Sequence, residues 1–107
     1  MFVRVVMSLV FALMCAGAAQ AGDVEDADAA FVKKDYATAL TKWRSAAQQG
    51  SASAQFSLGL MYDEGKGVAQ DFKEAVRWYK LAAAQGNAKA QFNLGISYGK
   101  GEGVAQD

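Results

Sequence analysis

The sequence predicts an all-α fold, an α-solenoid of antiparallel helix pairs with a 36-residue repeat. Its 107 residues include no proline and are 52% hydrophobic, a composition that favours uninterrupted helices. Residues 51–71 and 87–107 are identical at 13 of 21 positions under a shift of 36 residues. The same shift aligns residues 36–50 with 72–86. A unit therefore has two halves, and each half shows the apolar spacing of a helix.

The first 21 residues have the layout of a secretory signal peptide. Arg4 supplies a positive start, an apolar run follows, and Ala19 and Ala21 form a small-residue cleavage pattern. The apolar run is too short for the roughly 20 residues of a membrane-spanning helix, which disfavours an anchor. Lipid attachment at Cys15 is disfavoured because the preceding residues do not match a lipoprotein signal. We expect cleavage after Ala21, a periplasmic or secreted location, and no membrane contact after cleavage.

Residues 22–50 are predicted to form an N-terminal helix pair. Its second helix lies in 36–50, and its partner lies in 23–33, which is rich in aspartate and alanine. Four acidic residues gather at the start of that partner helix: Asp23, Glu25, Asp26 and Asp28. Acidic side chains suit the N-terminal end of a helix dipole, whereas a calcium site needs loop-held ligands and a glycine. The helix-start interpretation is therefore favoured over a metal site.

Residues 51–86 are predicted to form one complete repeat, with its first helix at 51–63. Two pairs of apolar residues are spaced i, i+4 in that helix: Leu58 with Tyr62, and Phe56 with Leu60. Together they span an arc too wide for a single buried face. We expect this helix to be covered on more than one side.

The second helix of that repeat is predicted at 72–85, with an apolar side and a basic side. Asp71 and Glu74 have the spacing of a capping box, with Asp71 as the N-cap. The loop Gly65-Lys66-Gly67-Val68 joins the two helices, and Val68 is expected to pack onto the core. We interpret this loop as a turn rather than a phosphate loop, because it follows a helix and lacks the required spacing. Gly50 and Gly86 are expected to end helices with positive φ.

Residues 87–107 form an incomplete repeat. Asp107 aligns with Asp71, so the helix that it would cap is missing from the sequence. Repeat arrays usually need about three units and a polar terminal cap. We therefore expect a fragment of a longer reading frame or a truncated product. In either case the last helix would expose apolar residues and could support self-association.

These motifs resemble the Sel-1-like repeat, a tetratricopeptide-like family, over essentially all of residues 35–107. The complete repeat carries the pattern at these positions: Ala54, Leu58, Gly59, Tyr62, Gly65, Gly67, Val68, Asp71, Ala75, Trp78, Tyr79, Ala82, Ala83 and Gly86. The second copy repeats it at Leu94, Gly95 and Tyr98. The resemblance implies a right-handed superhelix of helix pairs that serves as a scaffold for protein partners. Small residues such as Gly59 and Gly95 are expected where neighbouring helices come close.

A strip of residues on the first helices of the repeats is the candidate partner-binding site. It contains these residues: Ser53, Phe56, Leu60, Lys89, Phe92 and Ile96. In tetratricopeptide-like arrays the first helices line the concave groove, where such a strip could take an extended or helical peptide. Packing against neighbouring helices explains the same apolar residues, so that alternative stays open. For Trp43, Trp78 and Tyr79, a place in the core is the favoured interpretation.

The predicted function is a protein-interaction scaffold in the cell envelope, with no catalysis of its own and no cofactor. Eleven basic and eleven acidic residues give a balanced charge, which argues against a nucleic-acid partner. Some exported relatives are cysteine-rich and carry a β-lactam-hydrolase label. That alternative is disfavoured, because the chain has no histidine and its only cysteine, Cys15, lies in the predicted signal peptide. A self-assembling structural fragment is the other alternative.

Overall fold

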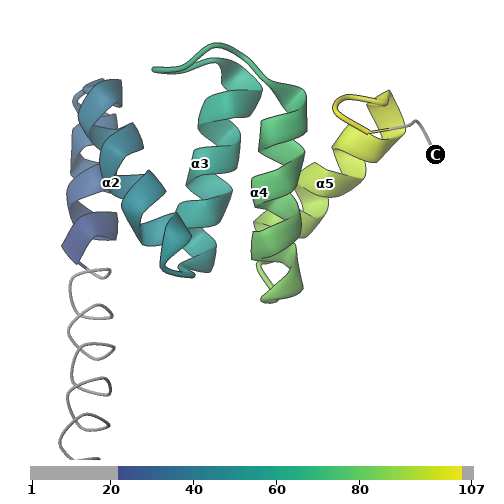
Figure 1. Cartoon of the computed structure of the whole chain (residues 1–107), viewed down its shortest axis with the longest axis horizontal. Coiled ribbons are helices and arrows are strands. Elements are labelled where there is room, and N and C mark those ends of the chain that lie inside the picture. The colour runs from purple at the N-terminus through teal and green to yellow at the C-terminus, as the bar shows by residue number, and fades with distance from the viewer. Residues whose placement is uncertain (1–21, 105–107) are drawn as a thin grey trace, which may run out of the picture.

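The computed structural model describes residues 22–104, and the regular secondary structure in that range is entirely helical (Figure 1). Residues 22–32 form a helix, here named the N-terminal segment. Four helices of equal length follow: α2 (Tyr36–Gln48), α3 (Ala52–Glu64), α4 (Phe72–Ala84) and α5 (Ala88–Lys100). The prediction of an all-α solenoid is confirmed. The predicted signal peptide, with Ala19 and Ala21, lies outside the described residues.

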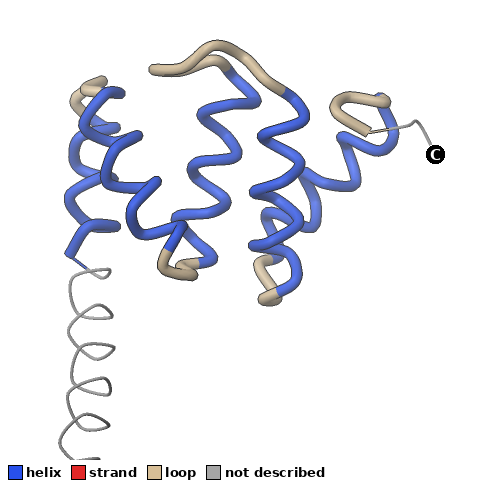
Figure 2. The backbone as a smooth tube through the Cα atoms, in the orientation of Figure 1, coloured by secondary structure: helices blue, strands red, loops and turns tan. Residues whose placement is uncertain are grey.

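Helices that follow one another in the chain also pack against one another. α3 packs against α2 on one side and α4 on the other, and α5 packs against α4. Short turns join α2 to α3 and α4 to α5 at one end of the row, and the longer α3–α4 loop lies at the other end (Figure 2). This arrangement gives α3 the coverage on two sides that its wide apolar arc predicted.

Each helix from α2 to α5 begins at a polar N-cap whose side chain accepts a hydrogen bond from the backbone three residues later. The N-caps are Asp35, Ser51, Asp71 and Asn87. Only half of the predicted capping box forms. Asp71 accepts from the Glu74 N–H at 3.2 Å, but its own N–H donates to the Tyr62 carbonyl at 2.9 Å. The Glu74 carboxylate instead accepts two hydrogen bonds from Arg77, so the reciprocal bond was predicted wrongly.

The loop glycines allow each repeat to lie close against the unit before it. Gly67 and Gly103 have φ of 75° and 77°, a region that side chains rarely adopt. A Cβ on Gly67 would lie 3.0 Å from the Cβ of Tyr36, the first residue of α2. A Cβ on Gly103 would overlap the carbonyl of Phe72, the first residue of α4. Both loops therefore cross the start of a helix in the preceding unit. This close approach explains why a glycine recurs at this position of each repeat, at Gly67 and at Gly103.

The core consists of two apolar clusters that share α3. The first joins the N-terminal segment, α2 and α3, and Trp78 of α4 is buried in it. Val68 packs against this cluster from the loop, as predicted. The second joins α4 and α5, and Phe56 and Leu60 of α3 pack against it. Trp43, Trp78 and Tyr79 are all buried, in agreement with their predicted place in the core.

Gly59 marks the closest approach between α3 and α4. A Cβ on this residue would lie 2.6 Å from Cε1 of Tyr79 and 3.3 Å from the Ala75 carbonyl oxygen. Gly95 occupies the same repeat position on α5, yet a Cβ there would meet no heavy atom within 4 Å beyond the nearby backbone of its own helix. The difference arises because no described helix packs against that face of α5.

Candidate binding surface

Part of the predicted strip lines one broad hollow. Ser53 and Phe56 of α3 and Lys89 of α5 lie around a depression of about 530 Å³. The remaining lining residues are Val24, Asp28, Ser57, Asn87 and Ala88. The hollow thus brings together side chains from the N-terminal segment, α3 and the start of α5. These are the first helices of successive units, so all three units contribute residues to one surface.

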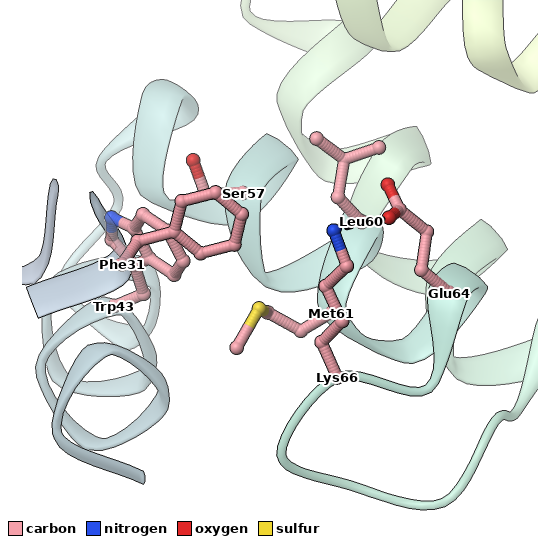
Figure 3. Close-up of a pocket in the computed structure, with 7 residues that line it drawn as sticks. All are labelled: Phe31, Trp43, Ser57, Leu60, Met61, Glu64 and Lys66. Atoms are coloured by element: carbon pink, nitrogen blue, oxygen red, sulfur yellow. Dashed lines mark ion pairs between the residues drawn. The ribbon is translucent and has the colours of Figure 1, made fainter. Parts of the chain in front are cut away.

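Leu60 lines a second, smaller pocket between the N-terminal segment, α2 and α3 (Figure 3). Its volume is about 190 Å³. The apolar lining is Phe31, Trp43, Leu60 and Met61, and the polar lining is Ser57, Glu64 and Lys66. Because both hollows include Ser57, they adjoin on the same face of the molecule.

An ion pair stands at the edge of the smaller pocket. Lys66 Nζ lies 2.8 Å from Glu64 Oε2 and 5.3 Å from the centre of the Phe31 ring. The hydrogen bond to Glu64 raises the pKa of Lys66 above its ordinary value. A donor and an acceptor thus lie beside an apolar cavity.

The other two residues of the predicted strip, Phe92 and Ile96, line neither hollow. Phe92 is 70% exposed and Ile96 is 40% exposed on α5. Phe56 holds the same repeat position as Phe92, and its ring packs 6.0 Å from the ring of Tyr79 in the second helix of its own repeat. Phe56 therefore both packs against a neighbouring helix and lines the hollow.

A polar network links α3, α4 and α5 next to this surface. The Tyr79 hydroxyl donates to Asp63 Oδ2 at 2.9 Å and accepts from Asn93 Nδ2 at 3.4 Å. Burial raises the pKa of Tyr79, with the Asp63 carboxylate adding to the effect. The phenol therefore stays protonated and acts as a structural hydrogen-bond donor.

Three of the four acidic residues of the N-terminal segment have structural partners. Lys42 Nζ lies 3.9 Å from Asp23 and 3.6 Å from Asp26, and Asp28 accepts a hydrogen bond from the Trp43 indole at 3.2 Å. Residues 22–104 contain no group of three or more metal-ligating side chains. Within the same range, no helix has the length and apolar character needed to cross a membrane.

Two glutamines form a repeated contact that sequence reasoning missed. Gln55 donates to the Ala47 carbonyl at 3.1 Å, and Gln91 donates to the Ala83 carbonyl at 3.2 Å. The signal was available, because Gln55 and Gln91 are identical residues 36 positions apart. Phe31 was missed for another reason: it lies before the part of the chain that the 36-residue alignment covers.

The family model described as Sel1 repeat matches residues 26–51, 52–87 and 88–107. A crystal structure of a protective antigen with an SLR fold, from uropathogenic Escherichia coli strains, is 44% identical with a TM-score of 0.66. The match covers 67% of this chain and 15% of that one. The crystal structure of a Sel1 repeat protein from Oxalobacter formigenes is 41% identical with a TM-score of 0.65. That match covers 66% of this chain and 29% of that one.

No curated protein matches the chain. This chain spans less than a third of each of the two solved structures, 15% and 29% of their lengths. The family model nevertheless matches three successive segments that together run from residue 26 to residue 107. The chain belongs to the Sel1 repeat family.

Proposed function

We propose that the chain is a protein-interaction scaffold whose binding surface is the face formed by the N-terminal segment, α3 and α5. Sel1 repeat proteins generally act as scaffolds of this kind. The observation that carries the proposal is the hollow of about 530 Å³, which is lined from three successive units. A polypeptide lying across it would contact all three units, so the order of the repeats would determine which partner fits.

The side chains around the hollow suit a polypeptide partner. Ser53, Ser57 and Asn87 offer hydrogen-bonding groups for a main chain, and Phe56 offers an apolar contact. Asp28 and Lys89 contribute one charge of each sign. This mixed lining lacks the basic excess that a nucleic-acid partner requires. We propose a protein or peptide ligand and no cofactor.

Photo-crosslinking tests this surface. A photoreactive residue in place of Ser53, which is exposed in the hollow, is expected to give discrete adducts with a polypeptide partner in the native host. The matched control is the same substitution at Thr41, which is exposed on α2 and lines neither hollow. Identical adduct patterns from the two sites would show that the hollow is not the binding surface.

We further propose that the protein acts in the cell envelope, and that it binds rather than catalyses. The support for export is the signal-like pattern of residues 1–21. Intact mass measurement on the periplasmic and secreted fractions should find a product that starts at Gly22. A cytoplasmic product that retains Met1 would refute export. The support for binding without catalysis is the absence of histidine from the sequence, together with the structural role of Tyr79.

Self-association through α5 is a second candidate, favoured by the exposure of Phe92 and Ile96 on one helix. Apolar side chains this exposed are typical of contact surfaces when they cluster. Sedimentation of the 107-residue chain should then show a concentration-dependent mass, and Phe92→Ser should shift it toward the monomer. A monomer at all concentrations would rule this candidate out and leave the scaffold proposal intact.

A further inference from the structure

We infer that the pocket between the N-terminal segment and α3 receives one large apolar side chain of a bound polypeptide, a phenylalanine, leucine or methionine. The inference rests on the proposed scaffold function and adds a chemical identity to one contact of the ligand. We call this hollow the anchor pocket. It is lined by Phe31, Trp43, Leu60 and Met61, with Glu64 and Lys66 at its edge.

The size and lining of the anchor pocket match a single side chain. Its volume is about 190 Å³, and an apolar cavity of roughly 150 Å³ can hold a benzene molecule. The Phe31 and Trp43 rings lie 5.5 Å apart, and the Met61 side chain points toward them (Figure 3). Thioether and aromatic surfaces adapt well to a ring or a branched aliphatic group. The pocket is therefore too small for a folded element and suited to one residue.

The edge of the pocket identifies that occupant as part of a polypeptide. The Glu64 carboxylate accepts hydrogen bonds and the Lys66 ammonium donates them, and both side chains remain partly exposed. A peptide main chain presents an N–H donor and a carbonyl acceptor on either side of each side chain. Besides bonding each other, the carboxylate has further acceptor sites and the ammonium has further N–H donors, which a peptide main chain can use and a free hydrocarbon cannot.

The next junction along the array is more polar at several of the same repeat positions. Tyr79 replaces Trp43, Asn93 replaces Ser57, and Ser97 replaces Met61 under the shift of 36 residues. There the Tyr79 ring packs on Phe56 and its hydroxyl donates to Asp63. The Trp43 ring packs on Phe31 and its indole N–H donates to Asp28. The ion pair positions are also reversed in sign, with Lys100 for Glu64 and Glu102 for Lys66. Among the described residues, the first junction thus has a more apolar lining than the next, which favours the anchor pocket as the place for the ligand's apolar side chain.

Methionine methyl NMR on the full chain tests the inference directly. The sequence has four methionines, and the signal of Met61 is identified by its loss in Met61→Leu. N-acetyl-phenylalanine amide is the probe, and N-acetyl-asparagine amide is the polar comparison. The Met61 signal should shift with the phenylalanine probe and saturate in the millimolar range, about 1–10 mM, as expected for one side chain without its flanking peptide. The asparagine probe should leave the signal unchanged.

Two matched variants separate pocket binding from nonspecific contact. Ser57→Leu places an apolar side chain in the anchor pocket and should abolish the probe-induced shift. Asn93→Leu makes the same change one repeat later and should leave the shift as in the unmodified chain. An unmoved Met61 signal, or equal shifts in all three proteins, would overturn the inference. Crosslinking from Ser53 would still support the scaffold function in that case, so the two failures are distinguishable.

Discussion

Adding one methyl group at two equivalent glycines should change stability in opposite directions. Gly59→Ala and Gly95→Ala each replace a glycine inside a helix, 36 residues apart. In both, the helix itself gains about 1 kcal/mol, because alanine has less backbone freedom to lose on folding. At Gly95 a new Cβ meets no heavy atom within 4 Å beyond the nearby backbone of its own helix, so the gain should appear in full.

At Gly59 the same methyl group meets the Tyr79 ring, with Cε1 at 2.6 Å and Cδ1 at 2.7 Å. The ring cannot swing aside, because Tyr79 is fully buried and its hydroxyl is held by Asp63. Overpacking of this kind costs about 1–3 kcal/mol, and contacts this short favour the upper value. The net expectation is a loss of about 2 kcal/mol for Gly59→Ala and a gain of about 1 kcal/mol for Gly95→Ala.

Thermal unfolding followed by circular dichroism measures both effects. For a domain of this size the net changes correspond to a Tm lower by about 10 °C for Gly59→Ala and higher by about 5 °C for Gly95→Ala. The free energies should be confirmed by urea unfolding, in which the slope with denaturant should stay constant. Shifts of the same sign in both variants would refute the argument that Gly59 is required for close packing of α3 on α4.

Three further predictions concern stability. Leu58→Ala should destabilise the fold by about 2–5 kcal/mol because Leu58 is fully buried, and urea unfolding should show a smaller loss for partly exposed Leu60→Ala. The folded protein raises the pKa of Tyr79 above its ordinary value of about 10, so the protonated phenol stabilises the fold fully below pH 10 and this stabilisation is lost at higher pH. The free energy of unfolding of Tyr79→Phe, measured at alkaline pH, should lack this dependence. Asp71→Ala should cost about 1 kcal/mol in thermal unfolding through loss of the N-cap, whereas Glu74→Gln should leave the cap unchanged.

The helices were predictable because their signals are local. Ser51 and Gly65 flank α3 as N-cap and C-cap, so the predicted range of 51–63 differs from Ala52–Glu64 by one residue at each end. The expected cover on two sides of α3 followed from the width of its apolar arc alone. Internal repetition then extended the same assignment to α5 without further assumptions.

Contacts between units were harder to predict, because sequence spacing does not specify how helices stack. Ser53, Phe56 and Lys89 line one hollow, while Leu60 lines the anchor pocket and Phe92 lies outside both. All of them lie at helical spacing on the first helices, so periodicity could not separate them. The place of Phe31 in the anchor pocket could not be predicted for a different reason. It lies before the part of the chain that the 36-residue alignment covers, so no aligned copy was available for comparison.

The loop and glutamine contacts share a direction along the chain. Gly67 packs on Tyr36 and Gly103 packs on Phe72, while Gln55 bonds to the Ala47 carbonyl. In every case a residue reaches toward a helix that precedes it in the sequence. Each unit therefore rests on a surface that was synthesised earlier. A nascent chain of this design can consolidate in the order in which it leaves the ribosome, with each new helix pair docking on a template already in place.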